Sequence, residues 1–264
     1  MTIKLYWHRG KGRVDASQQN FGDYLSPLIV EAVSGRSVIY APLKEAEMMA
    51  IGTILANEHK ARRYGFKRRI HVWGSGCGQP DEQFSDRHYY HAVRGRETKD
   101  RILGGGEGMV FGDPGLLAEL LVLKPSEKKY KFGFVPHYVD AKRSDVVSFI
   151  NDSDVHVIDV FAQPELVLEQ IASCEFVVSS SLHGLVVADA YGVPNVRVRI
   201  STGLIDELKF ADYYSAYSMV EPVPMSFEQL RGLCNSDIYN YIETYERPGL
   251  CRIKENLIKA FPYA

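Results

Sequence analysis

The residue types best suited to chemistry gather in segment 174–194, where an apolar, strand-like run ends in three serines and a helix is expected to follow. Free backbone N–H groups at a helix start favour a phosphate or a carboxylate, and a serine there can cap the helix. His183 falls in the first turn, where an imidazole can donate to the anion or exchange a proton. The residues expected to surround the anion are Ser180, Ser181, His183 and Gly184. A plain turn between strand and helix, with a surface histidine, fits the same pattern equally well.

Asp23 is the acidic candidate, in the run Asn20-Phe-Gly-Asp-Tyr-Leu-Ser-Pro27. Gly22 permits a tight turn, and Asp23 stands where a helix over 24–33 is expected to start. The local pattern favours a carboxylate that caps this helix. The alternative is a carboxylate that faces a ligand cleft as general base for a substrate hydroxyl. Asp113, in a run of turn formers, is expected to be a turn or capping residue.

Two further segments offer cationic side chains. Val93-Arg-Gly-Arg-Glu-Thr98 holds Arg94 and Arg96 around a glycine at an expected strand-to-helix junction. Arginine is suited to bidentate contact with carboxylate and phosphate, although a solvated pair is the ordinary alternative. His137 ends an expected strand, where a side chain can point into the ligand crevice of an α/β sheet. A core histidine is equally compatible with that position.

A basic segment, residues 60–69, holds six cations in ten residues and interleaves them with Tyr64 and Phe66. A solvated loop is the default interpretation. The functional alternative is contact with anionic lipid headgroups or with a diphosphate-linked acceptor. The cations expected to make that contact are Arg62, Arg63, Lys67, Arg68 and Arg69.

Composition is that of a globular protein: 264 residues, 45% of them hydrophobic and 24% charged, with a net charge of −2. This balance gives no indication of nucleic-acid binding. The four cysteines are scattered without a C-x-x-C pair, which is typical of reduced thiols in a cytosolic protein. With no leader-like start and no apolar run near the roughly 20 residues that span a bilayer, we expect a cytoplasmic protein, at most attached to a membrane surface. No cluster of metal ligands is visible in the sequence, so metal-independent chemistry is expected.

Strand-like and helical runs alternate, which favours an α/β fold with largely parallel sheets. The polar stretch 124–129 interrupts the pattern and divides the chain into an N-terminal α/β domain, residues 1–124, and a C-terminal α/β domain, residues 125–264. Two such Rossmann-like domains would face each other across a ligand cleft. The C-terminal helices are free to pack back on the N-terminal domain. Among the expected helices are 44–49, 97–103 and those within 236–260.

Short motifs, in order along most of the chain, resemble those of the polysaccharide pyruvyltransferase family, especially its bacterial exopolysaccharide ketal-pyruvate transferases. Each motif alone is modest, but their ordered coincidence is specific. They are Asn20-Phe-Gly-Asp23, Ile51-Gly-Thr-Ile-Leu55, Val72-Trp-Gly-Ser-Gly76, Val93-Arg-Gly95, Gly112-Asp-Pro-Gly-Leu116, Val135-Pro-His-Tyr-Val-Asp140, Ser180-Ser-Leu-His-Gly184 with Ala188-Asp-Ala-Tyr-Gly192, and Lys209-Phe-Ala-Asp-Tyr-Tyr214.

The resemblance implies two domains like those of the GT-B glycosyltransferases. Phosphoenolpyruvate would bind between an N-terminal acceptor side and a C-terminal donor side. Leu182, His183 and Arg94 are the residues that fit the family's donor contacts. Together with the local arguments above, the expected substrate-binding residues are Arg94, Arg96, Ser180, Ser181, Leu182, Gly184, Asn20, Gly22 and Lys209.

One departure from the family pattern concerns a donor-binding cation. Some members carry arginine immediately before Leu-His-Gly, whereas this chain has Ser181. That difference resembles the exopolysaccharide branch. The candidates to replace the arginine are Arg96, His137 and Lys209, among which the sequence does not choose.

The resemblance also implies an activity: transfer of the enolpyruvyl group of phosphoenolpyruvate to a hexose of an exopolysaccharide or lipid-linked oligosaccharide, as a cyclic ketal. His183 is expected to contact phosphate and act as acid, Asp23 to act as base, and His137 to assist. No cofactor is expected beyond the donor substrate. Two alternatives stay open: a GT-B-type glycosyltransferase using a nucleotide sugar, and a non-catalytic glycan- or phosphosugar-binding protein of the same fold.

Overall fold

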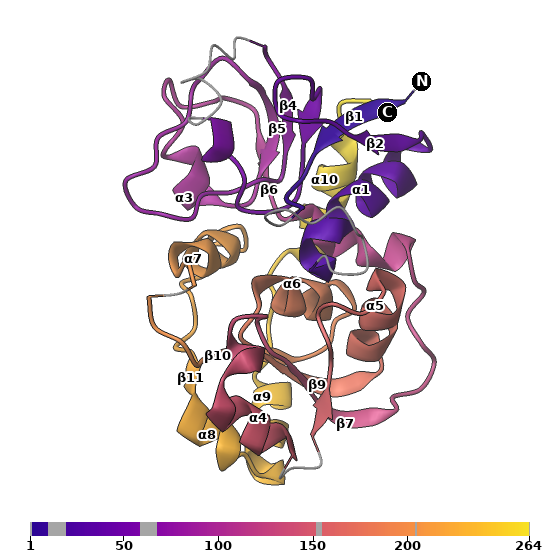
Figure 1. The fold of residues 1–264 in the computed structure, drawn as a ribbon, viewed down its shortest axis with the longest axis vertical. Helices are drawn as coiled ribbons and strands as arrows, with labels where there is room; N and C mark the ends of the chain where they lie inside the picture. The colour runs from indigo at the N-terminus through magenta and orange to yellow at the C-terminus, as the bar shows by residue number, and fades with distance from the viewer. Residues whose placement is uncertain (1, 10–19, 59–67, 152–154, 204, 264) are drawn as a thin grey trace.

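The computed structural model describes residues 2–9, 20–58, 68–151, 155–203 and 205–263. Two parallel sheets organise them, with strand orders β2-β1-β3-β4-β5-β6 and β11-β10-β9-β7-β8 (Figure 1). The strands of the first sheet are β1 Ile3–Tyr6, β2 Val38–Tyr40, β3 Met48–Met49, β4 His71–Trp73, β5 Tyr89–Val93 and β6 Val110–Phe111. Those of the second sheet are β7 Tyr130–Val135, β8 His156–Val157, β9 Cys174–Ser179, β10 Asn195–Arg199 and β11 Met225–Ser226. The expected α/β class with parallel sheets is confirmed.

Helices connect the strands and cover the sheets. The α-helices are α1 Phe21–Ser34, α3 Arg96–Lys99, α4 Ser144–Asn151, α5 Pro164–Ala172, α6 Leu182–Ala190, α7 Leu208–Ser215, α8 Phe227–Arg231, α9 Asn235–Glu243 and α10 Leu250–Lys259. Two 3-10 helices, η2 Pro114–Leu120 and η3 Asp140–Lys142, complete the elements. In the part of the chain that the structure describes, no helix combines the length and the apolar character that crossing a bilayer demands.

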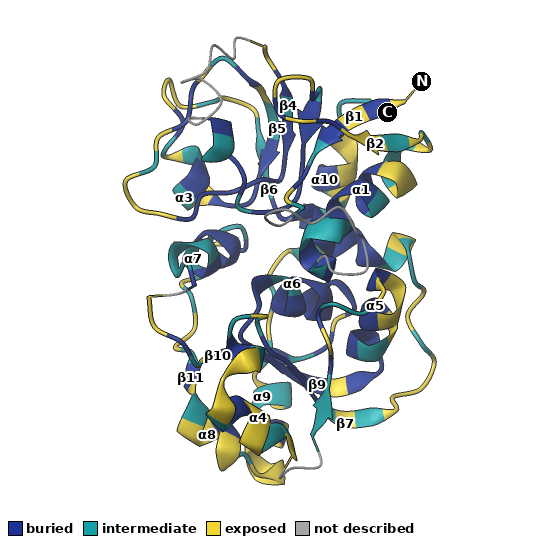
Figure 2. Ribbon diagram, viewed as in Figure 1, coloured by how far each residue is buried: buried dark blue, intermediate teal, exposed yellow. Residues whose placement is uncertain are grey.

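Helix α6 is the most deeply placed of the elements around the site. All of its residues are described, and all except His183 are buried. Apart from His183 and the buried Asp189, its residues are apolar or glycine on every face, as expected of a helix enclosed by other elements. Figure 2 shows this burial beside the exposed surfaces of α4 and α8. The accessible side chain of α6 is therefore that of His183, a titratable residue in its first turn.

The 3-10 helix η2 packs between α1 and α6. Asp113 caps η2 by accepting from the backbone N–H of Gly115 at 2.9 Å. A Cβ on Gly115 would lie 2.9 Å from a methyl carbon of Val186, so only glycine admits α6 at this distance. The starts of α1, η2 and α6 consequently meet at one place, although they lie far apart in the sequence.

One apolar core joins elements of both sheets. It includes Leu5 of β1, Leu116 of η2 and Leu185 of α6. Helix α10 returns to the first sheet, where the indole Nε1 of Trp73 donates to the carbonyl of Leu257 at 2.9 Å. The sheets are built from residues on either side of 124, but the division into domains 1–124 and 125–264 stays a prediction.

Two expected helices are wrong in whole or in part. Residues 44–49 form a turn followed by β3, because Met48 and Met49 are fully buried and pair with β1 and β4 on either side. Residues 97–103 are helical only to Lys99, the end of α3. Both errors arose where long-range pairing or packing overrode local propensity.

Candidate active site

A pocket of about 310 Å³ lies at the carboxyl ends of strands from both sheets. That position is the usual ligand crevice of parallel α/β sheets, and the volume suits a small ligand. Its described lining residues are His8, Asn20, Asp23, Gly52, Thr53, Ile54, Asn57, His137, Tyr138, Ser181, Leu182, His183, Ile205, Asp206 and Lys209. The structure thus brings together the three predicted catalytic residues and four of the predicted binding residues, Asn20, Ser181, Leu182 and Lys209.

His183 is held between two other motifs. On one side its ring lies against Gly22, where an added Cβ would be 2.6 Å from Cγ of the imidazole and 2.8 Å from its Cβ. On the other side its Nε2 lies 3.7 Å from Oδ2 of Asp113. Gly22 therefore serves to admit this imidazole, rather than the tight turn expected from the sequence.

The serines before α6 do not cap it. Ser181 occupies the N-cap position without a side-chain capping hydrogen bond, and Oγ of Ser180 instead accepts from the backbone N–H of His137 at 2.8 Å. The expectation of a serine cap is wrong. Because no side chain among the described residues caps the first turn of α6, its backbone N–H groups can bind an anion in the pocket.

Asp23 lies in the first turn of α1 but is not its cap, since Asn20 fills that role by accepting from Gly22 N–H at 2.9 Å. Burial raises the pKa of the Asp23 carboxyl, while the nearby His8, His183 and Lys209 lower it. A raised pKa makes the carboxylate a stronger base, which suits a general base. Asp23 therefore lines the pocket rather than capping α1, and its role as general base stays a prediction.

His137 also reaches the pocket from the end of β7. Burial, together with the charges of Lys209 and His183, lowers its pKa to about 4. The imidazole is consequently neutral near pH 7, and its Nδ1 accepts from the backbone N–H of Val139 at 3.3 Å. Ser180 acts on the site indirectly, through the hydrogen bond that holds the His137 backbone.

Lys209 on α7 supplies the aliphatic cation of the pocket. Burial lowers its pKa to about 8, with a smaller contribution in the same direction from Arg94, while Asp206 and Asp23 oppose the shift. Of the three residues proposed to replace the missing arginine, Lys209 and His137 line the pocket. Arg96 is exposed on α3, bonded to Ser218 at 3.2 Å, and lies outside the described lining.

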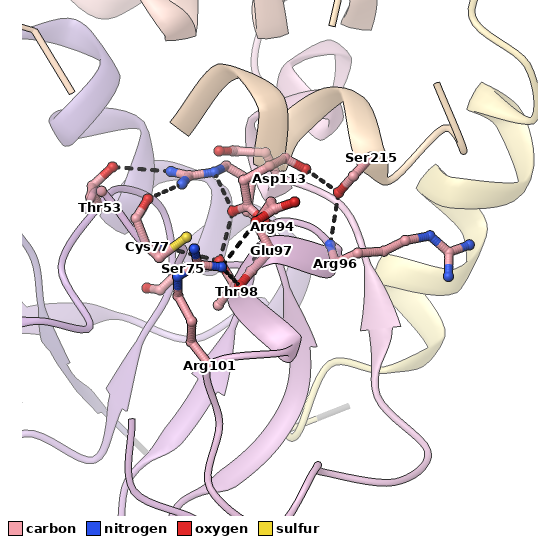
Figure 3. A network of polar contacts seen from close by, with 12 residues as sticks. Thr53, Ser75, Cys77, Arg94, Arg96, Glu97, Thr98, Arg101, Asp113 and Ser215 are labelled. Carbon is pink, nitrogen blue, oxygen red and sulfur yellow. Dashed lines mark hydrogen bonds and ion pairs between the residues drawn. The ribbon is translucent and has the colours of Figure 1, made fainter. Parts of the chain in front are cut away.

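Arg94 lies behind the pocket, fully buried, and is not among the described lining residues. Its Nε donates to Asp212 of α7 at 2.9 Å, its Nη1 to the Thr53 hydroxyl at 3.0 Å, and its Nη2 to the carbonyl of Cys77 (Figure 3). Asp212 also accepts from the backbone and hydroxyl of Thr98. The guanidinium of Arg94 thus joins α7 to the first sheet, and its expected contact with the donor stays a prediction.

Two glycines make this arrangement possible. A Cβ on Gly76 would lie 2.7 Å from Nε of Arg94, and one on Gly95 would lie 2.6 Å from the carbonyl carbon of Asp212. Gly184 has a similar packing role, since its added Cβ would be 3.0 Å from Cβ of both Ser179 and Val135. Gly184 thus seats α6 on the second sheet and does not line the described pocket.

The basic segment 60–69 is described only at its end. Arg62, Arg63 and Lys67 lie outside the described residues. Arg68 is exposed, donates to the carbonyl of Glu45 at 3.0 Å and lies 3.4 Å from the Glu47 carboxylate. The guanidinium of Arg69 lies 5.8 Å from the ring centroid of Tyr89.

Comparison with known proteins agrees with these motifs. A family model described as polysaccharide pyruvyl transferase matches residues 65–202, which is more than half of the 264-residue chain. The chain belongs to this family. Arg94, Asp113, His137 and His183 fall inside the region that matches the polysaccharide pyruvyl transferase model, whereas Asp23 and Lys209 fall outside it.

Two relatives of this pyruvyl transferase family member extend the comparison. The succinoglycan biosynthesis protein ExoV of Rhizobium meliloti (strain 1021) is 27% identical over 214 residues, covering 79% of this chain and 62% of ExoV. The uncharacterized protein L143 of Acanthamoeba polyphaga mimivirus is 34% identical over 138 residues, covering 49% of this chain and 48% of L143. The chain thus spans about half to three-fifths of the length of these relatives.

Sequence reasoning missed several lining residues of this pocket: His8, Thr53, Asn57, Tyr138 and Asp206. His8 and Tyr138 had a usable signal, because each follows a strand whose carboxyl end faces the crevice. Asp206 lies before α7, a helix that the sequence analysis did not anticipate. Asp113 was expected only to cap a turn; it does so, but it also faces His183.

Proposed function

We propose that this protein transfers the enolpyruvyl group of phosphoenolpyruvate to a hexose of an exopolysaccharide or lipid-linked oligosaccharide, forming a cyclic pyruvate ketal and releasing phosphate. The observation that carries the proposal is the meeting of His183, the start of α6 without a side-chain cap, and the half-buried Lys209 in one pocket. A small donor with a carboxylate and a phosphate needs clustered cations and free N–H groups. Family membership and the name of ExoV support the same chemistry and an exopolysaccharide acceptor.

The proposed reaction begins with a proton delivered to the methylene carbon of phosphoenolpyruvate, which leaves a cationic centre at C2. One sugar hydroxyl adds to C2 and loses its proton to Asp23. The bond between C2 and the phosphate oxygen breaks, and phosphate leaves toward Lys209 and the start of α6. A second hydroxyl of the same sugar then adds to C2 and gives its proton to His183, which became neutral in the first step, so the ketal closes and the acid is restored. His183 is the proposed acid, and the neutral His137 assists at the donor.

We also propose how the domains are arranged around the substrates and where the protein contacts a membrane. Two Rossmann-like domains in a GT-B-like arrangement would place the acceptor against the side of Asp23 and the donor against α6. A lipid-linked acceptor would bring the protein to the cytoplasmic face of a membrane, where segment 60–69 is the proposed contact. The chemistry is proposed to need no metal ion or other cofactor.

Mass spectrometry of product tests the proposed reaction. The protein is incubated with phosphoenolpyruvate and lipid-linked oligosaccharides, and separately with nucleotide sugars and the same acceptors. A product that gains one pyruvate ketal, with release of inorganic phosphate, is the expected result. Gain of a sugar from the nucleotide sugar, or binding of either donor without turnover, would overturn the proposal in favour of the glycosyltransferase or the binding protein.

Replacing Lys209 by methionine is expected to raise the KM for phosphoenolpyruvate about 10- to 100-fold, because a charge-assisted contact to the donor is lost. The lysine is cationic below its pKa of about 8, so donor affinity should fall as pH rises through that value. Lys209→Arg is the matched control, since it keeps the cation and should keep donor affinity above pH 8. An unchanged alkaline fall in that variant would contradict the assignment. Steady-state kinetics from pH 6 to about 9.5 check both points.

Replacing Asp23 by asparagine is expected to lower ketal formation about 10²- to 10⁴-fold while donor binding changes little, because the carboxylate is assigned to the acceptor hydroxyl. Titration calorimetry with phosphoenolpyruvate and product mass spectrometry separate the two effects. The control is Asp145→Asn, which changes a partly exposed carboxylate of α4 that pairs with Arg143. Loss of donor binding with the acceptor reaction intact would exclude Asp23 as the base.

A further inference from the structure

Two buried polar atoms face each other at the meeting point of η2 and α6. Oδ2 of Asp113 and Nε2 of His183 are 3.7 Å apart. Neither atom has a hydrogen-bond partner within the described part of the chain. Because an unpaired buried polar group costs free energy, each atom is the natural partner of the other. The separation exceeds a hydrogen bond by about half an ångström, and such contacts are often long before substrate binds.

The carboxylate is held rigidly. Its other oxygen, Oδ1, accepts from the backbone N–H of Gly115 at 2.9 Å and so caps η2. Asp113 is fully buried, and Pro114 follows it directly at the start of η2. Rotation of the carboxylate would break the cap, so Oδ2 stays directed at His183.

The imidazole is held equally rigidly from the opposite side. Gly22 leaves only enough space for the Cβ–Cγ–Nδ1 edge of the ring. Nε2 is a buried atom beside Asp113, whereas Nδ1, although its edge of the ring lies next to Gly22, is not one of the buried polar atoms that lack a partner. A carboxylate beside one ring nitrogen selects the tautomer that carries its proton there.

We propose that Asp113 is a positioning residue that accepts the Nε2 proton of His183, fixes the imidazole tautomer and leaves Nδ1 as the nitrogen that exchanges a proton in the reaction. The inference rests on the proposed function for its catalytic consequence, but not for the tautomer itself. Asp113 would not touch the substrate. The titratable groups that also interact with His183 are Asp23 on α1 and His137 after β7.

The substitution Asp113→Asn tests this role. Asparagine caps a helix about as well as aspartate, so the cap to Gly115 and the unfolding midpoint should persist. The amide group that replaces Oδ2 donates rather than accepts, so it should move the imidazole proton to Nδ1. In ¹⁵N spectra of histidine-labelled protein, the His183 signals, assigned by their loss in His183→Asn, should change from an Nε2–H to an Nδ1–H pattern. The kcat should fall about 10²- to 10⁴-fold with KM for phosphoenolpyruvate nearly unchanged.

Asp140→Asn is the matched control. Asp140 is also fully buried and also keeps one oxygen bonded, to Ser201, but it does not line the described pocket. This variant should leave the His183 spectrum and kcat unchanged. An Nδ1–H pattern in the unaltered protein, or an Nε2–H pattern retained in Asp113→Asn, would overturn the inference. A change of tautomer in a protein that never turns over phosphoenolpyruvate would instead support the inference and reject the proposed reaction.

Discussion

Replacing His183 by asparagine is expected to lower the rate of ketal formation about 10²- to 10⁴-fold, which is the usual contribution of a positioned general acid. His183 is the accessible residue of the otherwise buried helix α6. Its ring lines the pocket and lies between Gly22 and Asp113. Asparagine is smaller than histidine, so it fits beside Gly22 without strain. Product formation from phosphoenolpyruvate, followed by phosphate release, measures the effect.

His156→Asn is the control for this prediction. His156 lies on β8 in the same half of the chain and stacks on Tyr130 at 3.5 Å between ring centroids, away from the described pocket lining. Its replacement should preserve the rate. Full activity of His183→Asn, with the control also active, would remove His183 from the mechanism.

Replacing Gly22 by alanine is the second change with a large expected effect. The new methyl group would overlap the imidazole of His183, approaching Cγ to 2.6 Å and the ring nitrogen more closely still. Because the clash includes Cβ of His183, ring rotation alone cannot relieve it, and α1 must move from α6. We expect unfolding to become easier by about 1–3 kcal/mol, as in other overpacked sites, and activity to fall as far as in His183→Asn. Chemical denaturation and the product assay measure the two effects.

A double variant separates this clash from a general effect of alanine at the start of α1. In Gly22→Ala/His183→Ala the ring is absent, so part of the lost stability should return while activity stays low. Coupling between the two changes is expected because the side chains are in contact. Purely additive effects on the free energy of unfolding would show that the imidazole is not what excludes a side chain at position 22.

Local pattern predicted the elements with strong apolar signals. The helix expected over 24–33 is α1, Phe21–Ser34, and the strand followed by a helix expected within 174–194 is β9 followed by α6, because buried strands and helices have apolar residues at regular intervals. This local pattern did not predict the strand β3 formed by Met48 and Met49. Their strand is only two residues long, and it exists because β1 and β4 pair with it on both sides. The sequence of residues 44–49 alone does not show that β1 and β4 will pair with this segment.

In the candidate site, too, local sequence identified some residues, whereas distant contacts decided the roles of others. The helix start with His183, the acidic Asp23 and the strand-end His137 could be identified from residue type and position. The structural roles of Gly22 and Arg94 could not be identified in this way. Gly22 is required by a side chain more than a hundred residues away, and Arg94 is bound by Asp212 on a helix that the sequence analysis did not anticipate.

The sequence by itself determined the α/β class, the anion-favouring start of α6 and the family, because these depend on short motifs and on apolar periodicity. Only the tertiary structure decided that Lys209 enters the pocket while Arg94 supports α7, that Asn20 rather than Asp23 caps α1, and that Asp113 faces His183. The physical reason is that burial, charge proximity and hydrogen-bond geometry act between atoms close in space. Two side chains with the same local pattern acquire different roles when the fold gives them different neighbours.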